Sequence, residues 1–105
     1  MNVTNIEKAK DWFEVLQTSE RSQTAMMTLA SDQSSGKKAD AHEKSDQVLL
    51  TLEGELNGEV ADEWWTLKKG DVIMIPAGAK HRFTNRTQKR AMTFNVYSPP
   101  AYPAG

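Results

Sequence analysis

The stretch Gly70–Asn85, GDVIMIPAGAKHRFTN, constrains the fold of this chain more than any other part of the sequence. Within it, Asp71–Ile75 is rich in apolar and β-branched residues and is bounded by Gly70 and Pro76, a pattern typical of a short strand. Pro76 and Gly78 then fit a tight turn, because proline fixes φ and glycine tolerates positive φ. The stretch therefore predicts a strand, a turn and a second strand.

The second strand of this stretch carries one of the two histidines in the chain. Side chains alternate between the two faces of a strand, which puts His81, Phe83 and Asn85 on the same face. A histidine that shares a face with a phenylalanine, directly after a turn, indicates the mouth of a pocket.

The rest of the chain consists of short apolar or alternating runs separated by turn residues. Residues 1–11 predict a short helical or irregular lead-in. Trp12–Leu16 fits either a helix face or a strand, and a strand is favoured. Further strands are expected at 24–30, 47–53, 63–67 and 91–97. Asn57-Gly58 is a strong signal for a two-residue type I′ hairpin turn. Many short strands with little helix predict an all-β sandwich or barrel.

Composition excludes several classes of protein. The 105 residues suffice for one domain, and the absence of cysteine removes disulfides and thiolate metal sites. Thirteen Lys and Arg against fourteen Asp and Glu, with no basic run, argue against a nucleic-acid partner. No apolar run approaches the ~20 residues of a membrane span, and the first residues lack a signal-peptide core. A cytoplasmic protein is expected.

Two spaced motifs resemble the paired signatures of the cupin superfamily. The downstream motif is Gly70-x5-Pro76-x-Gly78-x2-His81-x3-Asn85, which agrees at every defined position. The upstream motif is Asp40-x-His42-x4-Gln47-x6-Gly54. In it, Asp40 stands where the family usually has its first histidine, and Gln47 stands where it has glutamate. The resemblance covers roughly residues 36–103.

The resemblance implies an antiparallel double-stranded β-helix, the jelly-roll β-barrel, with a short N-terminal lead-in. It implies a single domain over residues 1–105, with the core barrel at about 12–98 and a Pro-rich tail at 98–105. In small cupins such a tail commonly crosses to a partner subunit, so a homodimer is expected. Trp64 and Trp65 point to opposite faces of a strand, so at most one lines the barrel and the other caps an outer face or an interface. Phe83, Phe94 and Met74 are candidates for the interior.

The motif positions give a candidate metal site composed of Asp40, His42, Gln47 and His81. Two imidazoles, a carboxylate and an amide oxygen suit a divalent Fe, Mn, Ni or Zn ion. Gln47 is a weaker, neutral ligand than the usual glutamate. The competing interpretation is a polar pocket without metal, in which hydrogen bonds satisfy both histidines. In a variant of this interpretation, a shifted loop would put the ammonium of Lys44 in the pocket and exclude a metal.

Two functions follow from these interpretations. The first is a protein that binds a divalent metal and a small molecule inside the barrel, as in a metal-dependent oxygenase or isomerase of a small polar substrate. The second is a non-catalytic, metal-free small-ligand-binding or structural dimeric cupin. Acyl transfer is disfavoured, because the sequence has no nucleophile elbow and no ordered triad.

Overall fold

The structure is a computed structural model that describes residues 1–104. A short 3-10 helix, η1 (Ile6–Lys8), precedes eight strands within the described residues. The strands are β1 (Phe13–Thr18), β2 (Gln23–Leu29), β3 (Asp46–Glu53), β4 (Glu55–Val60), β5 (Glu63–Lys68), β6 (Val72–Ile75), β7 (His81–Thr84) and β8 (Ala91–Ser98). The expected lead-in and the favoured strand after residue 12 are both present.

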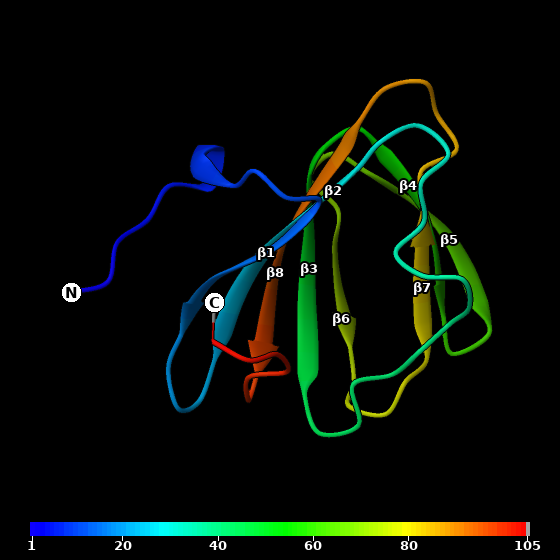
Figure 1. The fold of residues 1–105 in the computed structure, drawn as a ribbon. Helices are drawn as coiled ribbons and strands as arrows, with labels where there is room; N and C mark the ends of the chain where they lie inside the picture. The colour runs from blue at the N-terminus through cyan, green and yellow to red at the C-terminus, as the bar shows by residue number, and fades with distance from the viewer. Residues whose placement is uncertain (105) are drawn as a thin grey trace.

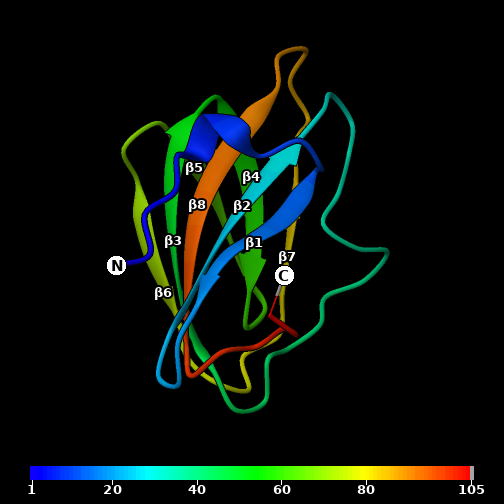
Figure 2. The ribbon, with the colours of Figure 1, turned by 60° about the vertical axis from the view of Figure 1, so that its left-hand side comes forward.

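The strands form two antiparallel sheets that face each other (Figure 1). The larger sheet has the order β1-β2-β8-β3-β6, and the smaller has the order β5-β4-β7. Figure 2 shows the long strands β2, β8 and β3 running side by side through the larger sheet. This confirms the expected antiparallel double-stranded β-helix. No strand is shared between the sheets, so the barrel is not closed and edge strands remain.

The apolar core lies between the two sheets. Leu29 and Leu49 contribute from the larger sheet, and Leu56, Leu67 and Phe83 contribute from the smaller one. Each of these five side chains is at most 2% exposed. Their burial on alternate positions of their strands is the period-2 pattern of strands with one face in a core.

The hairpin turn predicted at Asn57-Gly58 is wrong. Both residues lie inside β4, and the chain turns instead at Ala61 and Asp62, which have φ angles of 49° and 66°. Gly58 serves packing, since a Cβ there would lie 3.1 Å from Cε1 of Phe83. Glycine within a strand often marks such a close approach rather than a turn.

Two of the three residues predicted for the interior lie elsewhere. Met74 is 63% exposed, and Phe94 is half-buried on the face of β8 opposite the buried Thr93 and Asn95. Only Phe83 is in the core. Trp64 and Trp65 are both exposed, as members of an edge strand. The interior face of β8 carries the polar residues Thr93 and Asn95. Hydrophobicity alone therefore does not identify which residues of this strand face the interior.

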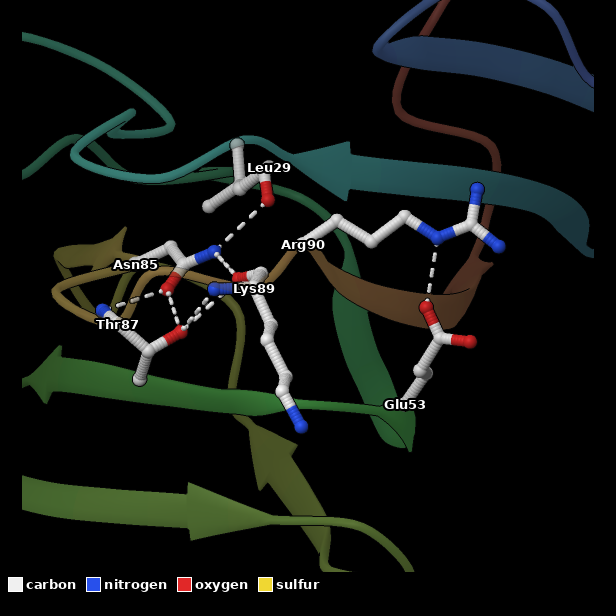
Figure 3. A network of polar contacts seen from close by, with 6 residues as sticks. All are labelled: Leu29, Glu53, Asn85, Thr87, Lys89 and Arg90. Carbon is white, nitrogen blue, oxygen red and sulfur yellow. Dashed lines mark hydrogen bonds and ion pairs between the residues drawn. The ribbon is translucent and has the colours of Figure 1, made fainter.

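The loop between β7 and β8 is organised by Asn85, which is fully buried (Figure 3). Its amide nitrogen donates to the carbonyls of Leu29 and Lys89, and its carboxamide oxygen accepts from the backbone and hydroxyl of Thr87. Beside this loop an ion pair of 2.7 Å joins Arg90 to Glu53 of β3. Asn85 therefore has a structural role at the end of the sandwich away from the histidines.

The described part of the C-terminal tail packs against its own chain. The side chain of Gln23, which is 1% exposed, accepts from the backbone of Ala101 and Tyr102 and donates to the carbonyl of Tyr102. The ring of Tyr102 lies 4.8 Å from that of Phe13 and 5.2 Å from that of Tyr97. The tail thus covers one end of the space between the sheets.

A candidate metal and ligand site at the paired histidines

Two loops that are distant in sequence are joined by backbone hydrogen bonds at the end of the sandwich that the tail covers. Asp40 and His81 exchange two backbone hydrogen bonds, of 3.0 and 2.8 Å. The amide of Gly78 donates to the carbonyl of His42 at 2.9 Å. The side chain of Asp46 accepts from the amide of Ala77 at 2.9 Å. The segment before β3 is therefore held against the turn before β7, and this brings the two histidines together.

The rings of His42 and His81 have centroids 5.1 Å apart and are tilted by 43°. Nδ1 of His81 lies 3.1 Å from the carbonyl oxygen of Ala79. Because a carbonyl can only accept, Nδ1 carries a hydrogen, and Nε2 is the nitrogen of this ring that can offer a lone pair to a metal. A ring nitrogen fixed in this way is the usual arrangement of a histidine that binds a metal through its other nitrogen.

His42 is held in its neutral form. Burial lowers its pKa below the ordinary value of 6.5, the nearby His81 lowers the pKa further, and Asp40 acts in the opposite direction. The neutral imidazole is the form that coordinates metals. The hydroxyl of Tyr102 lies 3.4 Å from Nε2 of His42, so a tail residue contacts this ring directly.

Gln47 presents an unpaired oxygen. Its side chain is buried, and its amide nitrogen donates to Oδ1 of Asn95 at 3.0 Å. The amide nitrogen of Asn95 in turn donates to the hydroxyl of Thr93 at 3.0 Å. This relay fixes the orientation of both amides and leaves Oε1 of Gln47 without a partner among the described residues. A buried acceptor without a partner is unfavourable unless a ligand or ion satisfies it.

Asp40 lies at the rim of the site. It is exposed, and one oxygen of its carboxylate accepts from the amide of Ala41 at 2.8 Å. Within residues 1–104, no three His, Cys, Asp or Glu side chains gather closely enough to hold a metal. The donors that line the same cavity are the two imidazoles and the free oxygen of Gln47. This set fits a divalent first-row ion bound through nitrogen and oxygen, with the carboxylate of Asp40 at its edge.

These residues line a cavity of about 450 Å³. Its walls include the aromatic side chains of Trp12, Phe13, Phe83, Tyr97 and Tyr102. Lys37 and Lys38 lie at its rim and are exposed. Burial raises the pKa of Tyr97, and the neighbouring Tyr102 adds to this effect, so the phenol of Tyr97 is uncharged at neutral pH.

The sequence alone did not identify Asn95, Tyr97 and Tyr102 as parts of this site. Alternation along β8 places Thr93, Asn95 and Tyr97 on one face, which is the signal that could have revealed the first two. Lys44, by contrast, is exposed and is not among the residues that line the cavity, so its ammonium does not fill the pocket. Asn85, which shares a face with His81, does not line the cavity either.

Comparison with known proteins identifies relatives at the levels of family, sequence and fold. Residues 25–97 match the family model of the cupin domain. Acireductone dioxygenase from Leishmania infantum is 39% identical over 59 residues, which is 51% of this chain and 17% of that protein. This chain thus spans less than a fifth of that relative's length.

Two crystal structures are similar over most of this chain. BH2720 from Bacillus halodurans has a TM-score of 0.88 at 23% identity, covering 98% of this chain and 84% of the other. TT1209 from Thermus thermophilus has a TM-score of 0.81 at 28% identity, covering 94% and 98%. Among residues 1–104, none of the helices has the length and apolar character that crossing a bilayer requires. With the family model matching more than half of its residues, the chain belongs to the cupin domain family.

Proposed function

We propose that this chain is a single cupin domain that binds a divalent Fe, Mn, Ni or Zn ion together with a small molecule in the cavity. His42, His81 and Gln47 would hold the ion, and Asp40 would contribute from the rim. The observation that carries this proposal is the free oxygen of Gln47, which is buried and lacks a partner among the described residues, in the same cavity as the imidazoles of His42 and His81.

The surrounding residues would bind and orient the small molecule. Aromatic side chains favour a planar or apolar body, and Lys37 and Lys38 at the rim favour a carboxylate or another anionic oxygen on it. A bound divalent ion would act as a Lewis acid or bind an oxygen-bearing substrate in this cavity. The similarity to acireductone dioxygenase over about half of the chain supports an oxygenase over an isomerase.

A second candidate function is a metal-free binding protein. Two observations favour it: within residues 1–104 no three side chains of the acidic, His or Cys type form a cluster, and the hydroxyl of Tyr102 already contacts Nε2 of His42. In this case the cavity would bind its small molecule by hydrogen bonds and aromatic contacts alone.

Elemental analysis and titration with the four metals separate these functions. We expect near-stoichiometric binding of at least one ion to the unchanged protein. His42→Ala and His81→Ala should each lower the affinity by more than about 100-fold, because each removes a nitrogen ligand. Lys44→Ala is the matched control, since Lys44 is exposed near His42 in sequence but lies outside the cavity. Absence of metal, with all three variants unchanged in ligand binding, would support the metal-free function.

The pH dependence gives an independent check. Histidine binds metals only in its neutral form, so acidification should release the ion. Because the pKa of His42 is lowered from 6.5, release should occur below this value rather than at it. Metal that stays bound at a pH of about 4 would show that the histidines are not ligands.

We also propose that the protein is a cytoplasmic homodimer. The support for a second copy is the exposure of both Trp64 and Trp65 on β5, since exposed apolar side chains favour association. Sedimentation of the purified protein tests the dimer, and fractionation of cells that express it tests the compartment.

A further inference from the structure

The outer edge of β5 is open and apolar. β5 pairs only with β4, along a ladder that runs without a register shift from Glu63 to Lys68, so its other edge has no strand beside it among the described residues (Figure 1). Trp64 is 64% exposed and Trp65 is 72% exposed. Natural proteins usually protect such edges with proline, bulges, charges or a covering segment. β5 contains no proline or bulge, and its central residues are uncharged.

The opposite edge of the same sheet, formed by β7, is protected. The outer edge of β7 is covered by the loop before β3, through isolated bridges of Ser34 with Thr84 and of Asp40 with His81. Within residues 1–104 no corresponding segment pairs with β5. The two edges of one sheet therefore differ, and the edge that stays open is the one that carries the tryptophans.

The charges that flank β5 are arranged for pairing with itself. Asp62 and Glu63 lie at one end of the strand, and Lys68 and Lys69 lie at the other. All four are exposed, and the one ion pair found within residues 1–104 does not involve them. When two copies of this strand run antiparallel, the acidic end of each meets the basic end of the other. Parallel pairing would instead bring like charges together, which is destabilising.

A twofold axis perpendicular to the sheet restricts the registers in which two copies of β5 can pair. Such an axis keeps each face of the sheet continuous, so only residues that share a face lie opposite each other. With Trp65 on the axis, Asp62 faces the partner's Lys68. With Thr66 on the axis, Glu63 faces the partner's Lys69, and Trp64 faces the partner's Lys68. Both registers place opposite charges together and the tryptophans at the centre.

The apolar area that the tryptophans of β5 expose is large enough to form the centre of an interface. A tryptophan side chain can bury roughly 150–250 Å², so the two partly exposed rings offer roughly 200–350 Å² on each copy. Met74, which is 63% exposed on β6 of the larger sheet, lines the same cavity as both tryptophans and extends this surface. Stable interfaces bury about 800 Å² on each partner, with an apolar centre and a charged rim.

We propose that β5 is the dimerisation edge, where it pairs antiparallel with β5 of a second copy and joins the two three-stranded sheets into one. This inference rests on the proposed homodimer and adds where and in which orientation the copies meet. The backbone hydrogen bonds of the open edge supply affinity, and the flanking charges set the orientation.

A charge exchange tests the proposal. One variant carries Asp62→Lys and Glu63→Lys, which makes the edge wholly basic. The other carries Lys68→Glu and Lys69→Glu, which makes it wholly acidic. Each variant alone should dimerise at least about tenfold more weakly than the unchanged protein, because like charges meet at both ends of the strand pair. An equimolar mixture should form a 1:1 heterodimer of twice the 11.7 kDa chain mass, as measured by sedimentation and native mass spectrometry.

Controls make the result specific. Asp11→Lys with Glu20→Lys makes the same change in net charge at exposed positions outside β5, and should leave the dimer unchanged. Circular dichroism confirms that each variant is folded. Variants that dimerise normally alone, or a mixture that forms no heterodimer, would overturn the β5 pairing even though a homodimer exists. A monomeric unchanged protein would overturn both the pairing and the homodimer, while metal titration of the same samples still tests the proposed function separately.

Discussion

At the scale of single residues, the candidate site depends on the orientation of the side-chain amide of Gln47. Gln47 could present either its nitrogen or its oxygen to the cavity, and only the oxygen can bind a metal. The choice is made by Asn95, whose own nitrogen donates to Thr93 and whose oxygen is therefore left to accept from Gln47. Asn95 thus acts through Gln47 as a positioning residue.

Replacing Asn95 with leucine should weaken metal binding without removing any ligand. Asn95→Leu keeps the approximate size of the side chain but removes the acceptor that orients Gln47. Partners of metal ligands typically contribute 10–100-fold in affinity, so we expect a loss of about that size in metal titrations. The Asn95→Asp variant keeps an acceptor for Gln47 and should retain most of the affinity.

Thr51→Val is the control for this experiment. Thr51 is buried in the same interior, and its hydroxyl also lacks a partner among the described residues. Removing that hydroxyl should leave metal affinity unchanged. Equal losses in Asn95→Leu and Thr51→Val would mean that the polar interior matters only for packing and that the relay does not orient Gln47.

Motif spacing alone located the residues at the centre of the site but not those around it. His42, Gln47 and His81 stand at defined positions of two motifs, so the sequence predicts that they lie close together, and in the structure they line the same cavity. Tyr102 could not be found in this way, because its place depends on hydrogen bonds between the tail and Gln23, which are 78 and 79 residues apart in sequence. Long-range polar contacts of this kind leave no local pattern.

At the scale of elements, the passage from one sheet to the other depends on Gly54. This residue joins β3 of the larger sheet to β4 of the smaller one with a φ of 77°. A Cβ at Gly54 would lie 2.5 Å from the carbonyl oxygen of Arg90 and 2.9 Å from Cα of Ala91. Both the backbone conformation and the lack of space therefore require glycine here.

Comparing Gly54→Ala with Gly70→Ala separates these two causes. Gly70 has a φ of 92° but nothing within 4 Å of the added Cβ, so its replacement should cost only the strain of the left-handed backbone, about 1–2 kcal/mol. Gly54→Ala must also displace the backbone at the start of β8, and we expect it to cost at least about 2 kcal/mol more. Denaturant unfolding measures both values. Similar values would show that the crowding at Arg90 relaxes freely.

The elements also show why turn signals in the sequence can mislead. Asn57-Gly58 has the composition of a type I′ turn, yet the chain turns at Ala61 and Asp62, where neither residue is glycine. The strand continues through Gly58 because Phe83 and Leu67 occupy the space that a side chain there would need. Tertiary packing thus overrides a local preference, and periodicity still located the strands themselves.

At the scale of the whole molecule, the two sheets face each other without sharing a strand, and the tail helps to close one end. Tyr102 contacts Phe13 of β1, Tyr97 of β8 and His42 of the loop before β3. Gln23 holds the tail in place with three hydrogen bonds, of 2.8, 3.1 and 3.0 Å. Residues that follow the last strand thereby become part of both the wall of the cavity and the stability of the fold.

Removal of the tail should therefore destabilise the protein in a way that depends on Gln23. A chain that ends at Ser98 loses these hydrogen bonds, each contributing about 0.5–1.5 kcal/mol, together with the half-buried ring of Tyr102, so we expect a loss of roughly 2–4 kcal/mol in the free energy of unfolding. Gln23→Leu should cost less in the truncated chain than in the full one, because the partners of Gln23 in the tail are already gone. A chain that ends at Pro103 keeps every one of these contacts and should match the full chain. If the effects of truncation and Gln23→Leu simply add, the tail is held by its aromatic contacts and the hydrogen bonds of Gln23 contribute little.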